Sequence, residues 1–184
     1  ERGLDVAASQ ATLAPLFKEV RGTLDWYCLD YWSQKLSLDI PTIKTGYSEG
    51  IRWRPQAETF LRHLNTSHLD VVLITNAHPV TLAMKAERLP LAQWFNHMVS
   101  SHDYGAPKET TRFWDTLMAE RPFDPERTLF VDDSEYVLDA ALAYGISHLI
   151  TLRQPDSTVA PREQTRFPAI HHFEEILQGL PDID

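Results

Sequence analysis

Three short segments of the chain carry residues suited to handling a phosphate group and a metal ion. Thr75 and Asn76 follow the apolar run Val-Val-Leu-Ile, and Lys108 stands in the segment Gly-Ala-Pro-Lys-Glu. Asp132 and Asp133 follow a second apolar run, Thr-Leu-Phe-Val. A threonine hydroxyl and the next backbone N–H can donate to phosphoryl oxygens, and a lysine neutralises their charge. Adjacent carboxylates supply the hard oxygen ligands that Mg²⁺ prefers, so the set suits phosphoryl transfer.

Each segment alone also has an ordinary structural explanation. Thr75 could end a strand and cap the next helix, and Lys108 could be a solvated surface lysine. Asp132 and Asp133 could combine an N-cap with a first-turn acid, although two like charges at a strand end are costly without a cation. The specific signal is therefore the order of the segments: strand and Thr-Asn, then Lys before a helix, then strand and Asp-Asp-Ser.

The elements that position these residues alternate between helices and short strands after residues 53–55. We expect strands over residues 71–74, 128–131 and 148–151, a short apolar run ending at 98–99, and helices over residues 56–64, 80–88, 109–119, 136–144 (closed by Gly145) and 170–177. Continuous apolar runs are typical of strands buried on both faces of a parallel sheet. The alternation predicts a doubly wound, mostly parallel α/β sheet that binds ligands beyond the carboxyl ends of its strands.

The part before residue 53 has a helical rather than an alternating pattern. Aromatic and aliphatic residues recur at helical spacing over residues 6–38, and Gly22 separates two predicted helices. The aromatic residues Trp26, Tyr27, Tyr31 and Trp32 could stack on a purine base. Packing within a small helical unit explains most of them better, with one of them facing a cleft.

Composition narrows the class of partner. The net charge of −9 and the lack of a Lys/Arg cluster argue against nucleic-acid binding. No apolar run approaches the roughly 20 residues of a membrane helix. Cys28 is the only cysteine, which excludes an intrachain disulfide and favours a reducing compartment, the cytoplasm. Because the sequence begins at Glu1 rather than Met, an earlier targeting segment stays open.

The segments VVLITNAHP, GAPKE and LFVDDSEYVLDAALAYGI resemble motifs two, three and four of the haloacid dehalogenase superfamily, in the expected order. TLDWYCLDYWSQKLSLDI resembles the helical cap of GMP/IMP-type 5′-nucleotidases. The resemblance implies a cap over residues 1–53 and an α/β core over residues 54–184. It also implies that Thr75, Lys108 and Asp133 are catalytic. Thr75, Asn76 and Lys108 would contact the phosphate, Asp133 would ligate Mg²⁺, and Asp132 would assist.

The implied function is Mg²⁺-dependent hydrolysis of purine 5′-monophosphates, with a small phosphate ester as the partner. The substrate could also be phosphoglycolate, a sugar phosphate or pyridoxal phosphate, because the cap sets that choice. Dehalogenation is disfavoured because it has no use for metal-ligating carboxylates. A response-regulator receiver is disfavoured because its acidic pair comes first in the chain and its lysine last. A pseudo-phosphatase that only binds phosphate stays open.

The family's nucleophile motif, Asp-x-Asp-x-Thr at the end of an N-terminal strand, is not found in this sequence. Asp182 and Asp184 have the spacing, but they end the chain and follow Pro181, so we interpret them as a coincidental acidic tail. We therefore expect a cap incomplete at its N-terminus and a core that lacks its first, central strand. Such a chain should be inactive and should not fold stably alone, because the neighbouring strands would have unpaired edges.

Four further residues carry expectations of their own. His78 is expected in the cleft because it lies close to Asn76 in sequence. Arg54 is expected at the surface near the hinge between cap and core, although it could reach a nucleotide. His171 and His172 are expected to make a poor metal site, since adjacent residues of a helix do not share a face.

Overall fold

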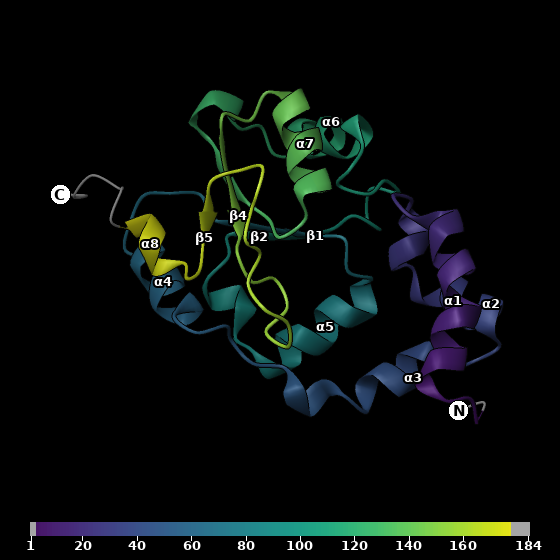
Figure 1. Cartoon of the computed structure of the whole chain (residues 1–184). Helices are drawn as coiled ribbons and strands as arrows, with labels where there is room; N and C mark the ends of the chain where they lie inside the picture. Colours follow the sequence, from purple (N-terminus) through teal and green to yellow (C-terminus); the bar gives the residue numbers. More distant parts are fainter. Residues whose placement is uncertain (1–2, 178–184) are drawn as a thin grey trace.

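The computed structural model describes residues 3–177 of the chain (Figure 1). The helical segment over residues 3–53, which we refer to as the cap, contains the helices α1 (Val6–Val20), α2 (Leu29–Leu36) and α3 (Ile40–Thr45), with the short 3₁₀ helices η1 (Leu24–Tyr27) and η2 (Ser48–Gly50). These helices gather beside the core rather than within it. Among the helices of the described part, none is both long and apolar enough to cross a bilayer.

Aromatic packing holds the first two cap helices together. The ring of Phe17 on α1 contacts Trp26 at 5.2 Å and Trp32 at 5.0 Å between centroids, both edge to face. Gly22 turns the chain between the helices with a φ of 80°, a conformation that residues with a Cβ rarely adopt. The expectation that Gly22 separates two helices is confirmed, with η1 as an additional element.

The core alternates helices and strands as the sequence predicts. Its main elements are α4 (Ala57–Leu64), β1 (Val72–Thr75), α5 (Pro79–Arg88), β2 (His97–Ser100), α6 (Thr111–Glu120), β3 (Leu129–Val131), α7 (Glu135–Tyr144), β4 (His148–Leu152), β5 (Ala169–Ile170) and α8 (Glu174–Leu177). The 3₁₀ helices η3 (Leu91–Gln93) and η4 (Pro125–Arg127) precede β2 and β3. Gly145 ends α7 with a φ of 109°, as its position predicts.

The prediction of one helix over residues 170–177 was wrong. The short strand β5 pairs in parallel with β4, in the register Thr151↔Ala169 and Leu152↔Ile170. The helix begins only at Glu174, after a turn in which one carboxylate oxygen of Glu175 accepts hydrogen bonds from two backbone N–H groups at 2.8 and 2.7 Å. The apolar spacing of the segment is compatible with a helix, but its first residues extend the edge of the sheet instead.

All strand pairs within residues 3–177 are parallel, but the strands form two separate sheets, β1-β2 and β3-β4-β5. A cavity of about 1790 Å³ is lined by residues of both β1 and β3, each of which pairs on one side with its own sheet. The residues of β1 are consequently half-buried, and Leu129 of β3 is 39% exposed. The expectation of strands buried on both faces was therefore wrong for β1 and for part of β3.

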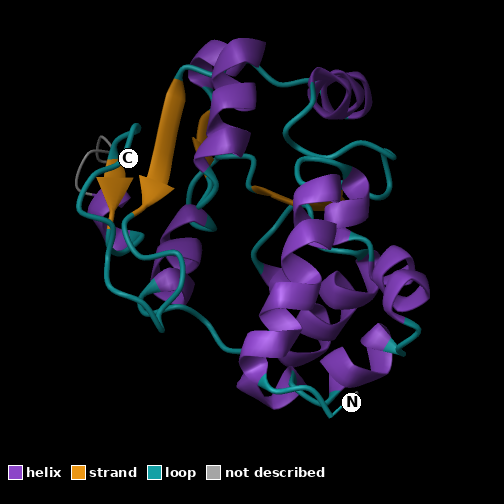
Figure 2. Ribbon diagram, turned by 45° about the vertical axis from the view of Figure 1, so that its right-hand side comes forward, coloured by secondary structure: helices purple, strands orange, loops and turns teal. Residues whose placement is uncertain are grey.

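Helices cover both faces of the strands, which confirms the doubly wound arrangement (Figure 2). One buried cluster joins α6 and α7 to the strands, and another joins α4 and α8 to them. Neighbouring strand residues alternate between these clusters: Phe130 and Leu149 belong to the first, Val131 and Ile150 to the second. Successive side chains of a strand point to opposite faces of the sheet, so neighbouring residues pack into different clusters.

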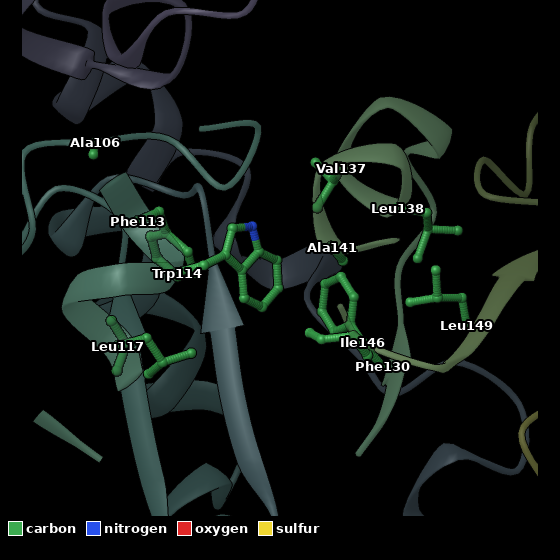
Figure 3. Packing of buried hydrophobic residues seen from close by; sticks show 11 residues of the cluster. Ala106, Phe113, Trp114, Leu117, Phe130, Val137, Leu138, Ala141, Ile146 and Leu149 are labelled. Carbon is green, nitrogen blue, oxygen red and sulfur yellow. The ribbon is translucent and has the colours of Figure 1, made fainter. Parts of the chain in front are cut away.

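Trp114 on α6 connects the two sheets (Figure 3). Its indole is 1% exposed and meets Phe130 of β3 edge to face, with the ring centroids 5.2 Å apart. It also stacks near Tyr144 at the end of α7, at 6.0 Å. Since α6 follows β2 in the chain, this packing holds the β1-β2 half of the core against the other half.

Candidate functional site

A cavity of about 610 Å³ lies where the cap meets the carboxyl ends of β1 and β3. Its core wall contains all of the residues singled out from the sequence: Thr75, Asn76, Lys108, Asp132 and Asp133. Its cap wall includes the aromatic residues Trp26, Tyr27 and Trp32. The structure thus brings the core-wall residues together although Thr75 and Asp133 are 58 positions apart in sequence, and it adds cap residues to them.

Thr75 and Asn76 end β1 at this cavity. The Thr75 hydroxyl oxygen accepts a hydrogen bond from the Ala77 N–H at 3.1 Å, which leaves the hydroxyl proton available to a ligand. The buried Asn76 amide is used at both ends: its Oδ1 accepts from the Lys108 N–H at 2.9 Å, and its Nδ2 donates to Glu109 at 2.9 Å. The Asn76 side chain therefore positions the loop of Lys108, and its own contact with phosphate stays a prediction.

Lys108 and Asp132 form a buried ion pair at the centre of the core wall. The lysine Nζ donates to Asp132 Oδ2 at 2.5 Å, and the side chains are 9% and 6% exposed. The other carboxylate oxygen of Asp132 accepts from the Ser134 N–H at 2.8 Å. The indole N–H of Trp114 donates to the Lys108 carbonyl at 2.8 Å, so the core also fixes the backbone of the lysine. The lysine head is held at a defined place rather than being free in solvent.

Asp133 is exposed to the cavity, and the protein atoms around its carboxylate desolvate it in part. This desolvation raises the pKa of Asp133, and the negative charge of Asp132 raises it further. Lys108 and Arg162 oppose the shift only in part. The positive charges near Asp133 therefore do not balance its carboxylate when it is ionised. The remaining negative charge attracts a cation.

A hydrogen-bond chain that sequence reasoning missed connects the cap to this wall. The Tyr27 hydroxyl donates to Glu109 Oε1 at 2.5 Å, and Glu109 Oε2 accepts from Asn76, the residue that holds the Lys108 loop. Burial raises the pKa of Tyr27 well above its usual range, and the Glu109 carboxylate adds to the effect. Tyr27 therefore stays a proton donor at neutral pH. The spacing of residues 27 and 109 in the sequence does not predict this hydrogen bond.

Two lysines of the cavity were also missed. Lys44 on α3 donates to Thr81 on α5 at 3.1 Å, across the boundary between cap and core. Burial, and then the charge of Lys85, lower the pKa of Lys44. Both lysines line the cavity and add positive charge to it, although the protein as a whole is acidic.

A family model of haloacid dehalogenase-like hydrolases matches residues 31–151. The chain belongs to this family. The matched region runs from α2 of the cap to β4 of the core, so it includes every residue of the core wall described above. The protein is accordingly a haloacid dehalogenase-like hydrolase.

Curated relatives of this hydrolase carry a more specific name. The GMP/IMP nucleotidase YrfG of Escherichia coli (strain K12) is 38% identical over 164 residues, which are 89% of this chain and 74% of that protein. The protein of the same name from Shigella flexneri matches with the same identity and coverage.

Solved structures support the fold. A HAD phosphatase from Thermococcus onnurineus superimposes with a TM-score of 0.76 at 15% identity, covering 96% of this chain and 81% of that one. The HAD-hydrolase YfnB from Bacillus subtilis, solved bound to magnesium, gives a TM-score of 0.66 at 22% identity, covering 95% and 80%. At these identities the likeness concerns the fold alone.

The remaining sequence expectations for this hydrolase have mixed outcomes. Trp26 and Trp32 pack against Phe17 and also line the cavity, so packing and exposure to the cleft coexist. His78 lines the cavity as expected.

Two other expectations concern residues elsewhere in the chain. Arg54 donates hydrogen bonds to the carbonyls of Gln154 and Pro155 at 2.7 and 3.0 Å, which connects the start of the core to the loop after β4. The Asp-Ile-Asp segment at 182–184 lies outside the described residues.

We predict that Tyr27→Phe weakens the hold of the cap on the core of this hydrolase. The change removes the hydrogen bond to the partly buried Glu109 carboxylate, a loss of about 1.5–3 kcal/mol for a bond to a charged group. Urea unfolding should show the lower stability. Tyr47→Phe is the matched control, because Tyr47 is a cap tyrosine that is 77% exposed. Equal stabilities of the two variants would contradict the role of the Tyr27–Glu109 bond.

Proposed function

We propose that this hydrolase is a Mg²⁺-dependent phosphatase of purine nucleoside 5′-monophosphates. The observation that carries the proposal is the single cavity whose core wall holds Thr75, Lys108 and the Asp132-Asp133 pair, and whose cap wall is aromatic. Its volume of about 610 Å³ lies within the usual range of small-molecule sites. The name of the relatives at 38% identity supports GMP and IMP as the substrates to try first.

The core wall is suited to the phosphate. The Thr75 hydroxyl has a proton to donate, and the Lys108 ammonium sits at the floor of the cavity with its backbone fixed by Asn76 and Trp114. Donors held in place before the substrate arrives need no reorganisation during the reaction, which is why they stabilise developing charge well. In this proposal Thr75 orients the phosphate, and Lys108 neutralises it against the attacking carboxylate.

The adjacent aspartates fit a divalent metal ion. Asp132 is already held by Lys108 and the Ser134 N–H, and Asp133 is a desolvated carboxylate next to a like charge. Oxygen ligands of this kind match Mg²⁺, which would supply charge neutralisation of the transferred phosphoryl group. In this proposal Asp133 ligates the ion directly, and Asp132 assists while keeping Lys108 in place.

The aromatic cap wall is suited to the base. Trp26 and Trp32 are fixed by their packing against Phe17, so their cavity-facing surfaces are rigid. A purine has a large flat face that can stack on such a surface at little entropic cost. In this proposal the cap holds the base while the core holds the phosphate.

The nucleophile, in this proposal, comes from an extended segment that fills the 1790 Å³ cavity between β1 and β3. Within residues 3–177 each of these strands pairs with another strand on one side only, and an open strand edge strongly favours a partner strand. A strand inserted parallel to both would end beside Thr75 and Asp132, where a carboxylate could attack phosphorus. A second carboxylate would protonate the leaving oxygen, and water would then release phosphate from the acylphosphate. Without that segment the chain is inactive in this proposal.

The experiment combines the intact mass of the natural protein with a phosphate-release assay. We expect a mass several kDa above the 21.1 kDa of this sequence, and Mg²⁺-dependent release from GMP and IMP at roughly tenfold or more the efficiency seen with phosphoglycolate or a sugar phosphate. Faster release from one of those esters would overturn the substrate class. Binding of inorganic phosphate without any turnover, at a mass of 21.1 kDa, would overturn the enzymatic function in favour of a phosphate-binding protein.

A further inference from the structure

Three side chains with metal-binding atoms meet where the cap touches the core, apart from the aspartate pair. Cys28 is the N-cap residue of α2, His78 is the N-cap residue of α5, and His102 lies in the turn after β2. One ligand atom from each of them lies within 4.8 Å of the others. The imidazole rings of His78 and His102 meet edge to face, 4.9 Å apart. The three residues come from separate segments, so only the tertiary structure brings them together.

The hydrogen bonds around His102 leave one of its nitrogens ready to bind a ligand. The Ser100 hydroxyl donates its proton to the Ala77 carbonyl at 2.8 Å, so toward His102 Nδ1, 3.5 Å away, it can act only as an acceptor. This arrangement favours the proton on Nδ1 and a lone pair on Nε2. The Nε2 atom is buried and has no hydrogen-bond partner within residues 3–177. A buried polar atom without a partner is unfavourable, and a bound ion would supply the partner that this nitrogen lacks.

The other two residues are only weakly engaged. The Cys28 sulfur accepts from the Tyr31 N–H at 3.4 Å, a contact that a thiolate would also make. His78 Nδ1 accepts from the Val80 N–H at 3.3 Å, and its Nε2 lies 3.7 Å from the carboxylate of Asp30. Binding of a metal through either nitrogen of His78 exchanges one of these long contacts for a coordinate bond.

We propose that Cys28, His78 and His102 form a binding site for a thiophilic divalent cation, best matched by Zn²⁺. Thiolate sulfur and imidazole nitrogen are the preferred ligands of Zn²⁺, whereas Mg²⁺ requires oxygen. Tetrahedral Zn²⁺ places its sulfur and nitrogen ligands about 3.6 Å apart. The observed 4.8 Å limit therefore has to shrink by about 1 Å, which side-chain rotation can supply. Asp30, with a side chain that is 75% exposed and free to move, or a water molecule completes the set.

An ion at this position would connect the cap to the core. Cys28 and Asp30 belong to the cap, and His78 and His102 belong to the core. An ion bound by all of them connects the two parts beside the Tyr27–Glu109 bond and stabilises the closed arrangement of the cap. Its ligands differ from those proposed for the phosphate and for Mg²⁺, although His78 also lines the cavity that contains them.

The reactivity of the single thiol tests the proposal. Cys28 is the only cysteine of the sequence, so a chromogenic disulfide reagent reports on this site alone. We expect Zn²⁺ at roughly ten times its dissociation constant to slow the reaction about tenfold, because only the ion-free protein reacts. EDTA should restore the original rate, and Mg²⁺ should not slow it. Co²⁺ should produce a thiolate-to-metal charge-transfer band that is absent in Cys28→Ser.

The variants locate the ligands. His78→Ala and His102→Ala should each lose the protection by Zn²⁺, and His102→Gln provides a milder change at the same position. His63→Ala, an exposed histidine on α4, and Asp133→Asn, in the other metal site, should keep it. Circular dichroism identifies any variant that has not folded. Unchanged thiol reactivity in the presence of Zn²⁺, or full protection in both folded His102 variants, would overturn the proposal.

Discussion

Replacement of Asp133 by Asn is expected to lower kcat/KM for Mg²⁺-dependent phosphate release by on the order of 10³-fold. The amide is nearly isosteric but has no charge, so it cannot balance a divalent ion. The fall in kcat/KM should come from weaker metal binding and from the loss of transition-state stabilisation. Titration calorimetry should therefore show weaker Mg²⁺ binding by the variant. The assay uses the natural protein whose mass has been checked, with GMP as the substrate.

The folded state should not be weakened by Asp133→Asn. The pKa of Asp133 is raised by burial and by Asp132, which means that the folded protein disfavours its ionised form at neutral pH. An uncharged residue removes that repulsion, so unfolding by urea should require the same or a higher concentration. A loss of activity together with retained stability separates a role in the chemistry from a role in folding.

The matched control is Asp115→Asn, which neutralises an exposed carboxylate on α6. It should leave kcat/KM and Mg²⁺ binding unchanged. If Asp133→Asn kept its Mg²⁺-dependent activity within about tenfold of the wild type, the assignment of Asp133 as the metal ligand would be wrong.

Replacement of Lys108 by Met is expected to destabilise the protein by about 3 kcal/mol when no divalent ion is present. Methionine retains the length and apolar stem of the side chain but leaves the Asp132 carboxylate buried without its cation. The cost comes mainly from this uncompensated charge, since breaking a buried pair is far more costly than never having formed it. Urea unfolding in EDTA measures the effect, and added Mg²⁺ should recover part of it.

A double-mutant cycle separates charge from packing. Lys108→Met combined with Asp132→Asn should be more stable than Lys108→Met alone, because the second change removes the unpaired charge. Lys85→Met is the control, since Lys85 also lines the cavity but is exposed. It should cost little. If Lys108→Met were as stable as Lys85→Met, the buried pair would not hold the core wall together.

The fold class follows from local patterns in the sequence. Short apolar runs separated by helical periodicity predict a parallel α/β core, and the structure confirms β1, β3 and β4 close to the predicted ranges. These patterns reflect backbone geometry, the burial of one face of each element, and turn residues such as Gly145. All three depend mainly on residues that are close in sequence. The prediction at residues 170–177 was wrong because it used only local spacing. Ala169 and Ile170 pair with β4 as a strand, and this pairing is a contact between segments that are distant in sequence.

The core wall of the cavity was also predictable, because parallel strands end at the same edge of a sheet. Thr75, Lys108, Asp132 and Asp133 each follow or adjoin a predicted element end, and they meet at one cavity. Sequence order and the rule for ligand sites in α/β sheets were sufficient for this grouping. Their individual roles in phosphate and metal binding stay predictions.

Only the tertiary structure decided what the cap brings to the site. The contacts of Tyr27 with Glu109 and of Lys44 with Thr81, and the meeting of Cys28 with His78 and His102, join residues from elements with no shared periodicity. The gap between β1 and β3 likewise depends on how two half-sheets are held apart and bridged by Trp114. Periodicity along a chain determines which face of an element is buried, whereas contacts between elements depend on their relative placement, which the packing of the whole molecule sets.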